Sequence, residues 1–90
     1  MTSDRAERIH EILTTAFGPT ELLVKDQSHL HAGHAGARDG KGHFEVRIVA
    51  AAFAGRNRIE RHRMVHEALA DMLRTDIHAL SIKAYGPDER

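Results

Sequence analysis

The chain has 90 residues, which is enough for one domain and too few for two. Its 13 Lys and Arg balance 13 Asp and Glu, which argues against a chain-wide electrostatic footprint for nucleic acid or an anionic membrane. There is no cysteine, so disulfides, thiolate nucleophiles and cysteine metal cages are excluded. The unusual feature is histidine: there are eight, four of them within residues 29–43.

The first half of the chain predicts a helix, a strand and a long loop. Apolar residues at helical spacing predict an amphipathic helix over residues 4–17, which Gly18-Pro19 ends. Residues 21–26 read as a strand. Residues 27–42 are polar and contain four glycines, so we predict a mobile loop, and its length favours a function.

The second half predicts a strand, a helix and a further strand. Residues 43–50 alternate apolar and polar side chains, as in a strand with one buried face, and Phe53 should anchor the connection that follows. A helix is predicted over residues 57–73, and a strand over 79–85. The residues after Gly86-Pro87 should be frayed.

These elements define an α+β fold in one small domain over residues 1–90, with the order helix, strand, strand, helix, strand. The second and third strands are joined by a helix, so they should be parallel through a right-handed crossover. The result is a mixed three-stranded sheet with both helices on one face. No segment resembles a signal peptide or is long enough to span a membrane. We therefore expect a protein of the cytoplasm, or of an organelle matrix, with no membrane partner.

Three segments, taken in order, resemble the BolA family. The first is DQSHLHAGH at 26–34. The second is HFEVRIV, then FAG, then RHRMV, over residues 43–65. The third is IHALSI at 77–82. The resemblance covers nearly the whole chain, and it implies a fold similar to a type II KH domain, which agrees with the element order.

The resemblance also implies a partner and a cofactor. Members of the BolA family partner monothiol glutaredoxins and share a [2Fe-2S] cluster with them, and some bacterial members are described as transcriptional regulators. His78 matches the family's near-universal histidine in IHAL, which resembles a cluster ligand. The family places a loop histidine opposite it; His31 aligns best and His34 is the close second.

From the residues alone, these histidines have plainer interpretations. A single histidine such as His78, expected at the turn before the last strand, is more often a satisfied turn residue. A histidine-rich glycine loop containing His29, His31 and His34 can equally be a solvated segment with adventitious Zn²⁺ or Ni²⁺ affinity.

The number of ligands bears on how a cluster could be held. A [2Fe-2S] cluster needs four terminal ligands, and this chain offers two imidazoles and no thiolate. The isolated chain should therefore hold no cluster, and a glutaredoxin with its glutathione must supply the thiolates. Neutral histidine ligands should raise the reduction potential and make the cluster sensitive to protonation.

A basic run begins the second predicted helix: Arg56, Arg58, Arg61, His62, Arg63 and His66. Such a run can bind DNA phosphate, or the glutathione and acidic surface of a glutaredoxin partner. A solvated helix face is at least as good an interpretation. Arginine at a helix N-terminus opposes the macrodipole, which slightly favours an interaction. Gly33-His34-Ala35-Gly36 spells the G-x-x-G of KH domains, but its place between two strands argues against that role.

No catalytic motif is present, so we expect a non-enzymatic protein. The first hypothesis is an adaptor in iron–sulfur trafficking or iron sensing, with His78 and His31 or His34 at a shared cluster and the basic helix start lining the same surface. The alternative is a DNA-binding regulator, which requires Arg58, Arg61 and Arg63 to converge without acidic neighbours. A third is an inert domain whose loop scavenges metal. The free chain should be a monomer or a weak homodimer.

Overall fold

The computed structural model describes residues 4–27 and 42–89. Its elements are α1 (Asp4–Phe17), β1 (Glu21–Asp26), β2 (Gly42–Val49), the 3-10 turn η3 (Ala51–Phe53), α2 (Arg58–Ala68), α3 (Ala70–Thr75) and β3 (Ile77–Tyr85). Within these ranges, no helix is long and apolar enough to cross a membrane. The predicted mobile loop, with His31 and His34, lies outside the described residues except for Gln27 and Gly42.

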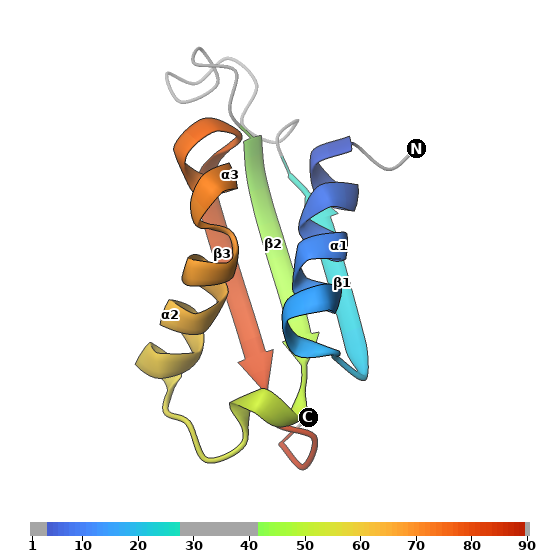
Figure 1. Ribbon diagram of the computed structural model, residues 1–90, viewed down its shortest axis with the longest axis vertical. Helices are drawn as coiled ribbons and strands as arrows, with labels where there is room; N and C mark the ends of the chain where they lie inside the picture. The colour runs from blue at the N-terminus through green and yellow to red at the C-terminus, as the bar shows by residue number, and fades with distance from the viewer. Residues whose placement is uncertain (1–3, 28–41, 90) are drawn as a thin grey trace.

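The three strands form one mixed sheet in the order β1-β2-β3, as predicted. The central strand β2 is antiparallel to β1 and parallel to β3. The helices of the described ranges cover one face of this sheet, and within those ranges no element covers the other face (Figure 1). The predicted fold class is confirmed.

The core lies between β2 and the helices. Phe44, Val46 and Ile48 project from β2 toward the helices and are almost completely buried, because alternate strand residues point to the same face. Against them pack Ile9 and Leu13 of α1, Val65 of α2, Leu69 and Met72. Phe53 is fully buried and its ring centroid lies 5.1 Å from that of Phe17, so the predicted anchor is confirmed.

The helix predicted over residues 57–73 is instead two helices, which meet at Leu69. The backbone there leaves helical geometry, with φ −101° and ψ 15°, while the Leu69 side chain is fully buried. The break keeps apolar side chains of both helices against the sheet, because Val65 of α2, Leu69 at the junction and Met72 of α3 are all buried. The apolar spacing that predicted one helix continues across the break, which is why the sequence did not reveal it.

Two further expectations were wrong at the ends of β3. The strand begins at Ile77 rather than residue 79, because the Gly42 N–H donates to the Asp76 carbonyl at 2.9 Å and starts the pairing there. The tail is held as far as Glu89, whose N–H donates to the Gly86 carbonyl and whose carboxylate binds Arg61. Local composition did not predict this long-range ion pair.

Candidate functional site

The candidate site residues that the structure describes lie at two opposite ends of the sheet. We call the end where β2 and β3 begin the histidine end, because it holds His43 and His78. We call the end where β3 finishes and α2 begins the arginine end, because it holds Arg56, Arg58 and Arg61. Figure 1 shows the two ends separated by the length of the strands.

At the histidine end, two imidazoles meet from neighbouring parallel strands. His78 is the second residue of β3 and is exposed, and its ring centroid lies 5.1 Å from that of His43, with 54° between the ring planes. Buried Ile77 fixes the start of β3, and the pairing of β2 with β3 shifts register between Gly42 and His43. The fold therefore places His78 in a strand, where the sequence predicted a turn.

A set of ion pairs holds the chain just before His78. The Asp76 carboxylate accepts from the Thr75 hydroxyl and pairs with Arg5 Nε at 3.4 Å and Arg8 Nη1 at 3.2 Å. The hydrogen bond from Thr75 lowers the pKa of Asp76 most; partial burial opposes it, and the two arginines lower it further. A carboxylate that stays charged thus ties α1 to the start of β3 and fixes the backbone beside His78.

The histidine end supplies nitrogen donors but too few for a complete metal centre. Over residues 4–27 and 42–89, no group of three or more His, Cys, Asp or Glu is placed to hold a metal ion. His78 is exposed and carries an imidazole nitrogen, the kind of donor that a shared iron centre would take. The described residues therefore fit a cluster completed by other ligands, and do not fit one held by them alone.

Sequence reasoning missed His43. Its place beside buried Phe44 showed that it points away from the core, but not which residue lies beside it on β3. Only the parallel pairing, in which His43 aligns with Ala79, brings it next to His78. In the structure His43 is half-buried, and its Nε2 is covered from solvent.

At the arginine end, a hollow of about 550 Å³ separates the start of α2 from the end of β3. Its lining is Arg56, Arg58, Arg61, His62, Ile82, Lys83, Ala84, Tyr85 and Glu89. Four of the six residues of the predicted basic run are thus brought together, and His66 is not among them. Arg63 does not line the hollow, and the acidic Glu89 does.

Arg61 contributes mainly to the fold. Only 11% of its side chain is exposed, and Nη1 donates to the Ala84 carbonyl at 3.1 Å and to Glu89 Oε2 at 2.9 Å. The hydrogen bond from Arg61 is the largest cause of the lowered pKa of Glu89. Arg61 therefore joins α2 to β3 and to the tail.

A capping box at the start of α2 also went unnoticed in the sequence. The Asn57 side chain accepts from the Glu60 N–H at 2.8 Å, and the Asn57 N–H donates to the Glu60 carboxylate at 3.1 Å. That backbone bond is the largest cause of the lowered pKa of Glu60. An acid in the first turn suits the helix macrodipole, which weakens the argument that arginines there signal an interaction. The Asn-x-x-Glu spacing at 57–60 was the readable signal.

The basic helix start does not line the same surface as His78, so that prediction was wrong. Arg61 contacts Ala84, six residues along β3 from His78, which is about 20 Å at the usual strand rise. The parallel crossover is the reason: α2 must begin where β2 ends, and β2 and β3 begin together at the other end.

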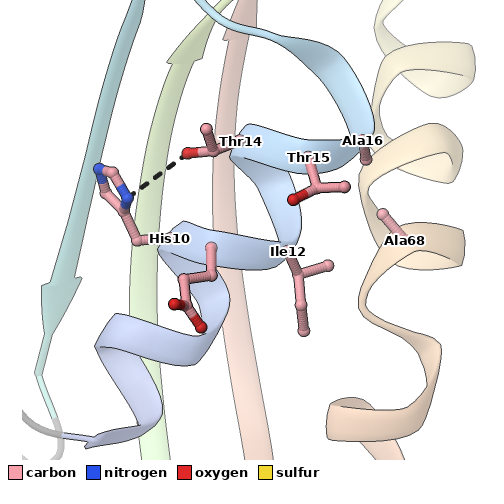
Figure 2. Close-up of a pocket in the computed structure, with 7 residues that line it drawn as sticks. His10, Ile12, Thr14, Thr15, Ala16 and Ala68 are labelled. Carbon is pink, nitrogen blue, oxygen red and sulfur yellow. Dashed lines mark hydrogen bonds between the residues drawn. The ribbon is translucent and has the colours of Figure 1, made fainter.

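A second hollow, of about 670 Å³, lies over the outer side of α1 (Figure 2). Ile12 and Ala16 face Ala68 of α2 across it, and on the β1 side His10 Nδ1 lies 3.5 Å from Thr14 Oγ1. None of the described residues that line it was a predicted site residue.

Comparison with known families decides the membership of the chain. The family described as BolA-like protein matches residues 13–89. The chain belongs to the BolA family. Its relatives include "DNA-binding transcriptional regulator BolA" of Escherichia coli, which is 42% identical over 79 residues, covering 88% of this chain and 72% of the relative.

Two Arabidopsis thaliana proteins are also similar to this BolA-family chain. "SufE-like protein 1, chloroplastic/mitochondrial" is 46% identical over 94% of the chain, and "Protein BOLA1, chloroplastic" is 44% identical over 96%. The chain spans 24% and 56% of their respective lengths. The solved BolA domain of SufE1 from the same plant superposes with a TM-score of 0.89 at 41% identity, covering all of both chains.

Proposed function

We propose that this BolA-family chain is a non-enzymatic adaptor that binds a monothiol glutaredoxin and shares a [2Fe-2S] cluster with it. The observation that carries the proposal is His78, an exposed imidazole held in register on β3. The ion pairs of Asp76 fix the backbone beside it without covering its ring. An exposed nitrogen donor on a rigid strand suits a ligand to a centre shared with another protein.

The number of donors supports a shared centre rather than a resident one. The described residues bring two imidazoles to the histidine end, and a [2Fe-2S] cluster takes four terminal ligands. Such a cluster, when bound, supplies one-electron redox chemistry. On this proposal, His78 gives one nitrogen, and His31 or His34 gives a second; glutaredoxin and its glutathione give the thiolates.

DNA-binding regulation is the second candidate, and the name of the E. coli relative favours it. The geometry supports it less. The alternative required Arg58, Arg61 and Arg63 to converge without acids, but Arg63 lies outside the hollow and Glu89 binds Arg61. Arg56 also pairs with Glu60 at 3.5 Å. The basic lining that remains is Arg58, His62 and Lys83. Three basic residues would bind DNA weakly, with an affinity that falls as salt rises.

The test is a titration of the purified chain into a monothiol glutaredoxin that carries its own [2Fe-2S] cluster and glutathione. We expect the visible absorbance and circular dichroism to change to a new spectrum that saturates at one chain per glutaredoxin. The same titration with a short DNA duplex in place of glutaredoxin, at low and moderate salt, tests the second candidate. An unchanged cluster spectrum with no complex on gel filtration would contradict the adaptor proposal.

The cytoplasm is proposed as the compartment, although two plant relatives carry chloroplastic names. Fractionation of cells that express the full chain with a C-terminal tag tests this. Recovery in an organelle fraction would contradict it and leave the glutaredoxin proposal intact.

A further inference from the structure

The outer edge of β1 presents free backbone groups. The Gln27 N–H donates to the His43 carbonyl at 2.7 Å, so Gln27 and His43 form a hydrogen-bonded pair of the β1–β2 ladder. Such pairs alternate with non-bonded pairs in an antiparallel ladder, so Leu23 and Lys25 bond to β2. The N–H and C=O groups of Leu22 and Val24 therefore point away from β2. Within the described part of the chain, no strand lies on that side.

A groove runs beside this edge, between β1 and α1. Its volume is about 790 Å³, and its lining is Asp4, Ala6, Glu7, Arg8, His10, Glu11, Leu22, Leu23 and Val24. Leu22 and Val24 are only partly buried and give it an apolar floor. Figure 1 shows α1 running alongside β1, and Figure 2 places His10 on the β1 side of α1. An edge strand beside a helix is the geometry in which a bound peptide adds as an extra strand.

The wall formed by α1 is acidic. Asp4, Glu7 and Glu11 repeat at helical spacing along it, and none of the three is ion-paired within the described residues. The one arginine in the wall, Arg8, pairs with Asp76 at 3.2 Å. His10 contacts Thr14. The groove is therefore apolar at its floor and negatively charged along one side.

We infer that the groove between α1 and β1 binds an extended basic segment of another protein, which adds to β1 as a fourth strand. Its backbone pairs with Leu22 and Val24. Its lysines or arginines point toward α1, where their aliphatic stems cover the apolar floor and their charged groups reach Glu7 and Glu11, while the alternate apolar side chains point to the other face of the sheet. A second copy of this chain is a poor occupant, because pairing β1 with β1 would bring two identical acidic walls together.

This inference goes beyond the adaptor proposal and does not depend on it. His78 lies on β3, which is the other edge strand of the sheet. Loss of cluster sharing would therefore leave the groove unchanged, and failure of the groove would leave His78 as a ligand. The two can be tested on the same protein by separate measurements.

The probe is a capped eight-residue peptide that alternates lysine and valine, titrated into the full chain and followed by NMR. We expect the amides of Leu22 and Val24 to shift and to gain protection from hydrogen exchange, because they acquire new acceptors. The amides of Leu23 and Lys25 should change little, because they already bond to β2. A peptide alternating glutamate and valine should bind at least tenfold more weakly.

Two matched variants test the two components of the site. Glu7→Lys with Glu11→Lys should weaken the lysine peptide at least tenfold, whereas Glu67→Lys with Asp71→Lys, the same charge change on exposed residues of α2 and α3, should alter affinity less than twofold. Val24→Pro removes an outward N–H and is tolerable at a strand edge, so it should abolish the Leu22 response. Val24→Thr, which keeps the N–H, should retain most of the binding.

Several results would overturn the inference. Absence of peptide binding would do so, as would equal binding of the lysine and glutamate peptides. Shifts confined to the open face of the sheet would place the peptide elsewhere. Dimerisation of the free chain through β1, seen by sedimentation and by loss of dimer in Val24→Pro, would assign the edge to a second copy instead.

Discussion

The histidine end and the arginine end both present side chains with nitrogen atoms, but these side chains make different contacts. At the arginine end, Arg61 is almost buried and bonded to Ala84 and Glu89, and the start of α2 is closed by a capping box. At the histidine end, the arginines bind Asp76 and leave the ring of His78 exposed. Arg61, which looked like part of a binding surface, supports the fold, while His78 keeps an exposed ring.

The comparison shows that residue type is a weak guide to role until the partners of each side chain are known. Arginine keeps its charge and can satisfy several acceptors at once, which suits it to joining a helix, a strand and a tail. An exposed neutral histidine keeps a nitrogen lone pair, which is what a metal takes. Predictions that separate stability from ligand binding therefore distinguish the two ends.

The largest expected effect is on stability, from Phe53→Ala. Phe53 is fully buried against Phe17 beside the arginine end, so the change should cost about 3–5 kcal/mol of unfolding free energy. Urea denaturation followed by circular dichroism measures it, with Phe53→Leu as the milder control. A cost under about 1 kcal/mol would mean that η3 does not anchor this end.

Arg61→Ala should have the next largest effect. It removes the bonds to Ala84 and Glu89, and the loss should be about 2 kcal/mol, because hydrogen bonds to charged groups are stronger than average. Arg58→Ala, a neighbouring exposed arginine, should change stability by less than about 0.5 kcal/mol. Equal effects of the two substitutions would show that Arg61 is an ordinary surface residue and that the arginine end is free for ligands.

Lowering the pH should weaken the ion pairs at both ends, and the loss of stability should be larger at the histidine end. The pKa values of Asp76 and Glu89 are lowered by folding, so each carboxylate stabilises the fold above its unfolded value, about 4. That stability is lost as pH falls through the lower folded values. Glu89 is 45% exposed and Asp76 only 18%, so solvent screens Glu89 more.

Urea midpoints between pH 6 and pH 2.5 test this difference. Asp76→Asn should flatten the pH dependence more than Glu89→Gln does. A wild-type protein whose stability rises on acidification over this range, or variants with the reverse ranking, would contradict the assignment of these two ion pairs.

The sequence predicted most of the fold because its apolar spacing is local information. The alternation of Phe44, Val46 and Ile48 placed β2 and its buried face correctly, and a helical connection implied a parallel β3. The break at Leu69 escaped because buried residues continue at helical spacing on both sides of it. Local pattern reports which face is buried, and not whether the backbone bends there.

The candidate site was less predictable because it depends on long-range pairing. His78 was found by resemblance, but its neighbour His43 is 35 positions away and is brought there only by the β2–β3 register. The bonds of Arg61 with Ala84 and Glu89 are equally non-local. His31 and His34 lie outside the described residues, so their roles stay predictions.

The most direct test of the account is His78→Ala in complex with a monothiol glutaredoxin. Because His78 is exposed, stability should change by less than about 0.5 kcal/mol, and docking should persist. The spectrum of the mixed cluster should be lost or revert to that of the glutaredoxin homodimer. The second ligand is identified in the same assay by testing His31→Ala, His34→Ala and His43→Ala. Combining the variant that lowers cluster stability with His78→Ala should give a non-additive loss of the cluster. A complex of His78→Ala with unchanged visible spectrum and cluster lifetime would contradict the account and leave only docking.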